Sequence, residues 1–370
     1  MPRIGVKVVR VLILGYSHLK YDKRVFRTVQ ALSKNAEVIY QFLSISEEHP
    51  YEDGNVNYVP LFKRSAKSFL DKVVKRVNFD KAIEKLVTET DFDVLYLHDF
   101  PITAPLAVFK AGRKKARKVV FDMHELYPGE RYERLPSPLR FIKRELMWRI
   151  LHEQVSLSDN LIFVSEEQRD EVLKRISLPR KVMVIPNYAS LSYQNTAKNR
   201  EICIVGRTSR QLTANEIRIL RALSDLGFTI KQIGTVTNLP SDLNHMNLPL
   251  LPYDEMMREI SKAAFTWISY YSDLVNLCPN DALSLPNKFF DSIGAGTPVI
   301  VKDSFVSMKR FVERYGIGVV INPDHVQESV EKISRAYEEY ALLVANILRH
   351  QQEFVWDSKK EEQFVQFVLG

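Results

Sequence analysis

The chain has 370 residues, of which 45% are hydrophobic and 26% charged. These values exclude a disordered or collagen-like chain and are typical of a globular protein with two domains. Two cysteines, Cys203 and Cys278, are too few for a disulfide framework and lack the spacing of a zinc site, so we expect a reducing, cytoplasmic location.

The net charge of +7 is distributed unevenly. Residues 1–190 contain 33 Lys and Arg against 24 Asp and Glu, whereas residues 191–370 contain 19 against 21. A basic first half suggests an anionic partner, such as a membrane surface or an anionic lipid carrier, although the charge can also serve solubility alone. No nucleic-acid-binding motif is present, so we do not expect nucleic acid as a partner.

The first predicted strand covers residues 6–14 and ends at a turn that contains Gly15. Its β-branched residues favour a strand, and Lys7 and Arg10 argue against a signal peptide. A helix is expected from Asp22, because an acidic residue suits a first helical turn. The dinucleotide fingerprint G-x-G-x-x-G is absent, so Gly15 taken alone indicates only a tight turn.

Residues 67–90 predict a long amphipathic helix. We expect its inward face to consist of Phe69, Val73, Val77, Ile83 and Val87. The outer face carries Lys67, Lys72, Lys75, Arg76, Lys81 and Lys85. Such a basic face is either solvated or lies on an anionic membrane.

Polar side chains follow two predicted strands. The strand from Asp93 ends in His98 and Asp99, and the strand from Val119 is followed by Asp122, His124 and Glu125. Ligands bind beyond the carboxyl ends of strands in α/β sheets, and histidine can donate or accept a hydrogen bond there. The spacing differs from that of a zincin helix, so we predict no metal.

The second half begins after a polar stretch, residues 190–200, that we interpret as an interdomain linker. A strand from Glu201 leads to a loop with Arg207 and Arg210, and Thr213 to Glu216 form a capping box. The two arginines could bind a diphosphate in a bidentate manner or remain solvated.

Residues 285–301 predict a helix followed at once by a buried strand. Pro286 opens the helix, and Phe289, Phe290 and Ile293 form an apolar stripe. Lys288 and Asp291 share a helix face near the N-terminus, where anions bind. A simple surface pair is the alternative interpretation.

Two segments, Asp122 to Pro128 and Pro286 to Val299, resemble the signatures of glycosyltransferase family 4, the retaining sugar-nucleotide enzymes with the GT-B fold. The resemblance implies an α/β protein with two Rossmann-like domains facing across a cleft. Residues 1–190 would form the acceptor-side domain and residues 191–354 the nucleotide-sugar-binding domain. Residues 355–370 would form a closing helix that returns to the first domain.

The resemblance also implies roles for single residues. His124 would face the donor sugar, while Arg207 and Lys288 would stabilise the leaving diphosphate. The expected donor-binding residues are Gly15, Arg210, Tyr253, Pro286, Asn287 and Asp291, with Asp291 on the ribose hydroxyls. We expect His98, Asp99 and Glu125 on the acceptor side. Leu283 and Leu212 depart from the family pattern, which has a glutamate and a lysine there.

The implied reaction is retaining, metal-independent transfer of a sugar from a nucleotide sugar to a glycan or lipid-linked acceptor, without a cofactor. Cell-surface polysaccharide or glycolipid synthesis at the inner face of the membrane would fit this reaction. A nucleotide-sugar 2-epimerase shares the architecture and is one alternative. A non-catalytic sugar-nucleotide-binding protein is another, favoured by Leu283 and Leu212.

Overall fold

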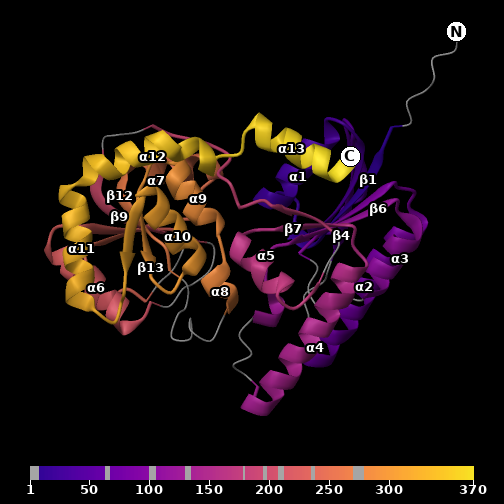
Figure 1. Cartoon of the computed structure of the whole chain (residues 1–370), viewed down its shortest axis with the longest axis horizontal. Coiled ribbons are helices and arrows are strands. Elements are labelled where there is room, and N and C mark those ends of the chain that lie inside the picture. Colours follow the sequence, from indigo (N-terminus) through magenta and orange to yellow (C-terminus); the bar gives the residue numbers. More distant parts are fainter. Residues whose placement is uncertain are drawn as a thin grey trace, which may run out of the picture. The chain divides into compact units, whose positions relative to one another are not determined.

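The computed structural model describes residues 8–62, 67–99, 106–129, 135–177, 180–194, 198–206, 212–234, 238–269 and 279–370 (Figure 1). The chain divides into two compact units. Unit 1 comprises Met1–Val164, Arg169–Ile185 and Ser358–Gly370, and unit 2 comprises Ser165–Gln168 and Pro186–Asp357. Each contains a mainly parallel sheet with helices, which confirms the predicted α/β class.

The sheet of unit 1 has the order β3-β4-β2-β1-β5-β6-β7-β8, in which only the β3–β4 pair is antiparallel. The strands are β1 (Arg10–Leu19), β2 (Glu37–Ser44), β3 (Tyr51–Asp53), β4 (Val56–Phe62), β5 (Val94–His98), β6 (Lys118–Met123), β7 (Asn160–Phe163) and β8 (Lys181–Val184). The central strand β1 is buried from Val11 to Leu14 and continues beyond the predicted turn to Leu19, with an irregular register after Leu14.

The helices along this part of the chain are α1 (Lys23–Ser33), α2 (Phe69–Glu89), α3 (Leu106–Lys115), η1 (Tyr127–Gly129), α4 (Ser137–Ser156), α5 (Glu166–Leu173) and α13 (Ser358–Leu369). The Asp22 carboxylate caps α1 by accepting the backbone N–H groups of Arg24 and Val25. Helix α13 packs within unit 1, where the carbonyls of Phe367 and Val368 accept hydrogen bonds from the side chains of Asn160 and Lys118.

Helix α2 corrects part of the predicted core. Ile83 and Val87 are fully buried as expected, but Val73 and Val77 are 46% and 45% exposed. Helix α2 packs on α3, and the apolar residues of its C-terminal half are buried, whereas those of its N-terminal half are exposed. This exposed stripe consists of Leu70, Val73, Val74 and Val77.

The sheet of unit 2 is parallel throughout, with the order β11-β10-β9-β12-β13-β14. Its strands are β9 (Asn199–Val205), β10 (Thr229–Ile233), β11 (His245–Leu248), β12 (Ala263–Trp267), β13 (Val299–Lys302) and β14 (Gly318–Ile321). Its helices are α6 (Ala214–Asp225), α7 (Tyr253–Lys262), α8 (Pro279–Leu283), α9 (Asn287–Gly294), α10 (Val306–Tyr315), α11 (Val326–Glu338) and α12 (Tyr340–Phe354). Helices α11 and α12 are separated only by Glu339, whose backbone leaves the helical region.

The Thr213–Glu216 capping box is present at the start of α6. In the part of the chain that the structure describes, no helix combines the length and the apolar character needed to cross a bilayer.

Candidate functional site

The neighbouring strands β1, β5 and β6 bring five polar residues to one edge of the unit 1 sheet. His18 lies near the end of β1, His98 ends β5, and Asp99 follows it. Asp122 lies in β6 and His124 follows that strand. Three of the predicted site residues, His98, Asp99 and His124, therefore share this edge, as expected for carboxyl ends of adjacent parallel strands.

The turn within β1 is held in an unusual conformation. A Cβ atom at Gly15 would lie 2.9 Å from the carbonyl oxygen of Gln41, so only glycine fits there without displacement. Tyr16 has a left-handed φ of 52° and exchanges two hydrogen bonds with the Gln41 side chain, at 2.8 and 3.1 Å. Asp99 is also left-handed, with φ of 38°. Such strain in non-glycine residues clusters at functional sites.

A buried ion pair lies beneath this edge. The guanidinium of Arg24 donates to both oxygens of the Asp122 carboxylate, the shortest contact being 2.6 Å to Oδ1, and the Tyr96 hydroxyl donates to Oδ2 at 2.9 Å. Burial alone would raise the pKa of Asp122, but the charge of Arg24 and the nearby histidines hold this pKa well below its ordinary value. Asp122 is therefore ionised.

His98 connects this pair to His124. Its Nδ1 lies 3.2 Å from Oδ2 of Asp122 and 3.1 Å from Nε2 of His124. Complete burial lowers the pKa of His98 to about 3 and outweighs the opposing effect of Asp122. His98 is therefore neutral near pH 7 and belongs to the buried network beneath His124.

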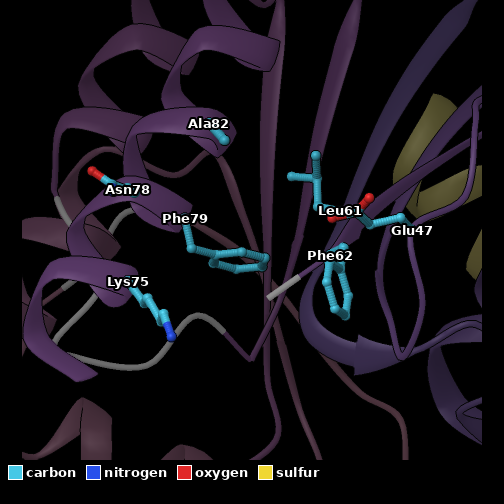
Figure 2. Close-up of a pocket in the computed structure, with 7 residues that line it drawn as sticks. All are labelled: Glu47, Leu61, Phe62, Lys75, Asn78, Phe79 and Ala82. Atoms are coloured by element: carbon cyan, nitrogen blue, oxygen red, sulfur yellow. The ribbon is translucent and has the colours of Figure 1, made fainter. Parts of the chain in front are cut away.

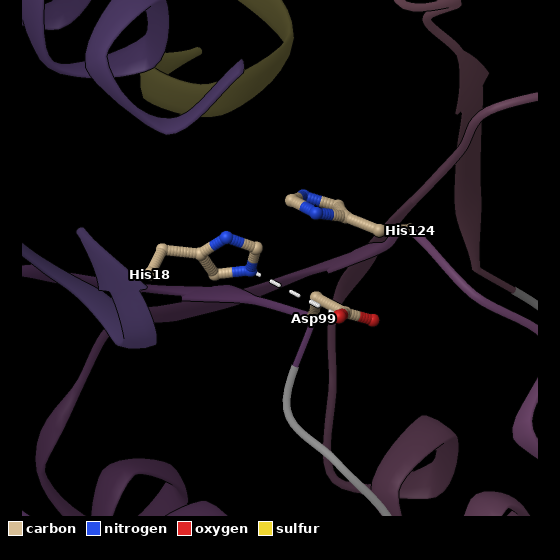
Figure 3. A group of neighbouring side chains, drawn as sticks. All are labelled: His18, Asp99 and His124. Atoms are coloured by element: carbon tan, nitrogen blue, oxygen red, sulfur yellow. Dashed lines mark ion pairs between the residues drawn. The ribbon is translucent and has the colours of Figure 1, made fainter. Parts of the chain in front are cut away.

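Figure 3 shows the outer part of the cluster, where His18, Asp99 and His124 face one another. The ring centroids of His18 and His124 are 5.1 Å apart, and Nε2 of His18 lies 3.9 Å from Oδ2 of Asp99. Burial would lower the pKa of His18, but the hydrogen bond and charge of Asp22 raise it overall. Oδ2 of Asp99 accepts a 2.9 Å hydrogen bond from the Tyr127 hydroxyl.

Two groups of three side chains could place ligand atoms around a cation. They are His18, Asp99 and His124, and His98, Asp122 and His124, with their ligand atoms within 4.8 Å of one another. The contact of Asp122 with Arg24 already balances the charge of the second group. In the first group, Asp99 accepts a hydrogen bond from Tyr127 and His18 contacts Asp22. We assign no metal to either group.

In unit 2, helix α9 buries two of the predicted residues. Nζ of Lys288 donates to the carbonyl oxygen of Ser269 at 2.7 Å, just beyond the end of β12. Asp291 is 3% exposed, and its Oδ1 accepts a 2.7 Å hydrogen bond from Tyr253. Because neither side chain is on the surface, the alternative interpretation of an exposed Lys–Asp pair is wrong.

The other predicted residues differ in their exposure and in whether the structure describes them. Pro286 is the N-cap of α9, Asn287 is exposed in its first turn, and Glu125 is partly buried beside His124 in the chain. Arg207 and Arg210 lie outside the described residues. The backbone carbonyl oxygen of Leu283 accepts hydrogen bonds from the hydroxyls of Ser165 and Ser307.

Sequence reasoning missed three charged residues. The sequence predicted no role for Arg24, and for Glu216 it predicted only a role as a helix cap. Glu216 is fully buried, and its Oε1 accepts from Lys302 at 2.9 Å and from the Ser269 hydroxyl at 2.7 Å. The polar residue Lys302 within a buried strand was a usable signal, because a buried lysine needs a partner.

A separate cavity of about 440 Å³ lies between α2 and the region around the end of β4 (Figure 2). Phe62, Lys75 and Phe79 are among its lining side chains. None of the residues predicted for the site lines it, so we do not connect it with that site.

Comparisons with known proteins identify the fold. Residues 22–192 match the model of Glycosyltransferase Family 4. Sucrose-phosphate synthase from Thermosynechococcus elongatus superposes with a TM-score of 0.70 at 11% identity, covering 97% of this chain and 98% of that one. The chain has the GT-B fold, and residues 22–192 are similar to glycosyltransferase family 4.

Two more solved structures share this fold. A trehalose-6-phosphate protein from E. coli bound with UDP-2-fluoro glucose gives a TM-score of 0.63 at 11% identity, covering 97% of this chain and 99% of that one. WaaG, a glycosyltransferase involved in lipopolysaccharide biosynthesis, gives 0.65 at 10% identity, covering 97% and 100%. No curated protein matches the sequence.

Proposed function

We propose that this chain transfers a glycosyl unit from a nucleoside-diphosphate sugar to an acceptor, with retention of the anomeric configuration and without a metal ion or cofactor. The observation that carries the proposal is His124, positioned by a buried polar network at the carboxyl end of β6, in the part of the chain that matches family 4. A nucleotide-sugar donor agrees with the UDP-2-fluoro glucose bound in one of the similar structures.

In the proposed reaction, the leaving group, the ribose and the sugar of the donor are each bound by different residues. Negative charge develops on the leaving diphosphate in the transition state, and cations or N–H groups stabilise it. Lys288, near the N-terminus of α9, supplies one such cation, and Arg207 and Arg210 are further candidates. Asp291 would hold ribose hydroxyls, and His124 would contact the sugar.

The full-length chain tests this proposal when it is incubated with UDP, GDP, ADP and TDP sugars and a panel of glycan and lipid-linked acceptors. We expect transfer with one donor, unchanged in the presence of EDTA, and proton NMR should show a product with the anomeric configuration of the donor. His124→Ala should abolish transfer, whereas His49→Ala, at an exposed loop position, should not.

Two other results would replace the proposal. Isomerisation of a nucleotide sugar without any acceptor would favour a 2-epimerase, and binding without turnover across the panel would favour a non-catalytic protein. Inversion of configuration, or activity lost in EDTA and restored by a metal, would contradict the mechanistic part.

We further propose that the acceptor is presented at an anionic membrane surface, which unit 1 contacts through α2 and α4. The stripe of α2 has a counterpart on α4, where Leu139, Phe141, Ile142 and Leu146 are between 49% and 66% exposed. Lysine and arginine side chains occur along both helices, including Lys72 and Arg149. Exposed apolar residues among basic ones are typical of a helix that lies in a lipid interface.

Co-sedimentation with vesicles tests this surface. We expect binding to vesicles that contain phosphatidylglycerol and little binding to neutral vesicles, with a marked loss for Val74→Glu and for Phe141→Glu. Leu342→Glu is the matched control, because Leu342 is 59% exposed on α12 in unit 2. Equal loss in the control, or binding that does not depend on anionic lipid, would contradict the membrane contact.

A further inference from the structure

A series of hydrogen-bonded, buried polar side chains ends at His124. It runs from Arg24 through Asp122 and His98, and the last link joins Nδ1 of His98 to Nε2 of His124 over 3.1 Å. His98 is fully buried, whereas the His124 side chain retains 12% exposure. Within this series of side chains, His124 is therefore the residue that a ligand can reach. The other members of the series determine how the His124 ring is protonated.

The first step concerns the proton of His98. The ionised Asp122 carboxylate can only accept hydrogen bonds, and neutral His98 has a single ring N–H. Because Nδ1 lies 3.2 Å from a carboxylate oxygen, the proton belongs on Nδ1. In the other tautomer, the lone pair of Nδ1 would face a lone pair of the Asp122 carboxylate. The proton would then lie on Nε2 of His98, and this atom has no hydrogen-bond partner among the described residues.

The second step concerns His124. Nε2 of His124 lies 3.1 Å from Nδ1 of His98 and can accept a hydrogen bond from the Nδ1–H group, which the Asp122 carboxylate also accepts. Nε2 of His124 cannot carry a proton of its own there, because two N–H groups would then face each other. The remaining acceptor nearby, Oδ2 of Asp122, is 3.6 Å from Nε2, beyond normal hydrogen-bond length. Neutral His124 is thus left with its proton on Nδ1.

We propose that His98, oriented by Asp122, acts as a positioning residue that holds neutral His124 in the Nδ1-protonated tautomer, so that His124 presents an N–H donor and not a base to the bound ligand. The ligand atom it fits is an acceptor oxygen, either a sugar hydroxyl or a phosphate oxygen of the donor substrate. Only this identification of the ligand rests on the proposed function.

Nitrogen NMR on the full-length chain labelled with ¹⁵N-histidine tests the tautomer directly. At pH 8, well above the ordinary histidine pKa, we expect His124, assigned by loss of its signals in His124→Gln, to show an unprotonated Nε2 and a protonated Nδ1. A protonated Nε2, or averaged signals of a tautomer mixture, would overturn the inference. The measurement needs no activity, so it remains decisive even if no glycosyl transfer is found.

Two substitutions separate positioning from packing. His98→Asn keeps an N–H donor close to the position of Nδ1, whereas His98→Leu removes it. We expect His98→Asn to keep the His124 tautomer and most of the activity. His98→Leu should give mixed tautomer signals and lower kcat by about tenfold or more, with a smaller change in KM. Unchanged His124 signals in His98→Leu would refute the role of His98. If this variant fails to fold, the wild-type spectrum alone decides.

Discussion

The hydroxyl group of Tyr253 donates a 2.7 Å hydrogen bond to Oδ1 of Asp291 and accepts the backbone N–H of Ser190 at 3.0 Å. These contacts join the start of α7 to the middle of α9 inside unit 2. The carboxylate proposed to hold the donor ribose is therefore fixed before a ligand arrives, which reduces the entropy lost on binding.

Tyr253→Phe should weaken the binding of the matching nucleoside diphosphate by about three- to tenfold, because one hydrogen bond that orients Asp291 is lost. Asp291→Ala should weaken it more. Isothermal titration calorimetry measures both effects. The control is Tyr315→Phe. The Tyr315 hydroxyl, at the end of α10, also donates a hydrogen bond to a carboxylate, that of Glu353, but this pair is not part of the proposed donor site. Equal affinity of Tyr253→Phe and wild type would contradict a role of this pair in the donor site.

Lys288→Met should lower kcat by about 10²- to 10³-fold, the usual effect of removing one group that stabilises developing negative charge. Nζ of Lys288 is held by the carbonyl of Ser269, so the ammonium group is already placed before the reaction. Steady-state kinetics with the identified donor measures the loss. Lys309→Met, at a 39% exposed lysine on α10, should leave kcat unchanged. A Lys288→Met enzyme with wild-type kcat would exclude the lysine from the reaction.

Local patterns in the sequence predicted much of this site. The polar run after β6 and the proline-led helix α9 were both recognisable, because strand ends and helix starts carry short signatures. The pairing of Arg24 with Asp122 was not predictable, since it joins helix α1 to strand β6 over 98 positions of sequence. Hydrophobic periodicity likewise predicted that Val73 and Val77 are buried, but both are exposed. Periodicity shows that a helix has an apolar face, not whether another element packs against that face.

Arg24→Met should destabilise unit 1 by about 3–5 kcal/mol, because it leaves the Asp122 carboxylate buried without its cation. Both side chains are almost fully buried, at 4% and 2% exposure. Urea unfolding followed by circular dichroism measures the shift in midpoint. Arg10→Met removes an exposed ion pair with Glu37 from the same sheet and should have little effect. Similar midpoints for the two variants would show that the buried pair contributes no more than the exposed one.

His98 makes the stability of the fold depend on pH in a definite direction. Its pKa of about 3 in the folded chain lies below the ordinary value of 6.5, so between these values the unfolded chain binds the extra proton. Stability should therefore be fully present above about pH 6.5 and should fall as the pH is lowered, by roughly 1 kcal/mol per pH unit from this group. Asp122, with its lowered pKa, should add to the loss only below about pH 4.

The measurement is the urea midpoint at several pH values between 7.5 and 5 for wild type and His98→Asn. The asparagine does not titrate, so its midpoint should change less with pH than that of the wild type. His49→Asn removes an exposed histidine and should keep the wild-type slope. Parallel pH profiles of wild type and His98→Asn would mean that His98 can be protonated in the folded state at little cost, and the buried network would then be more open than its contacts indicate.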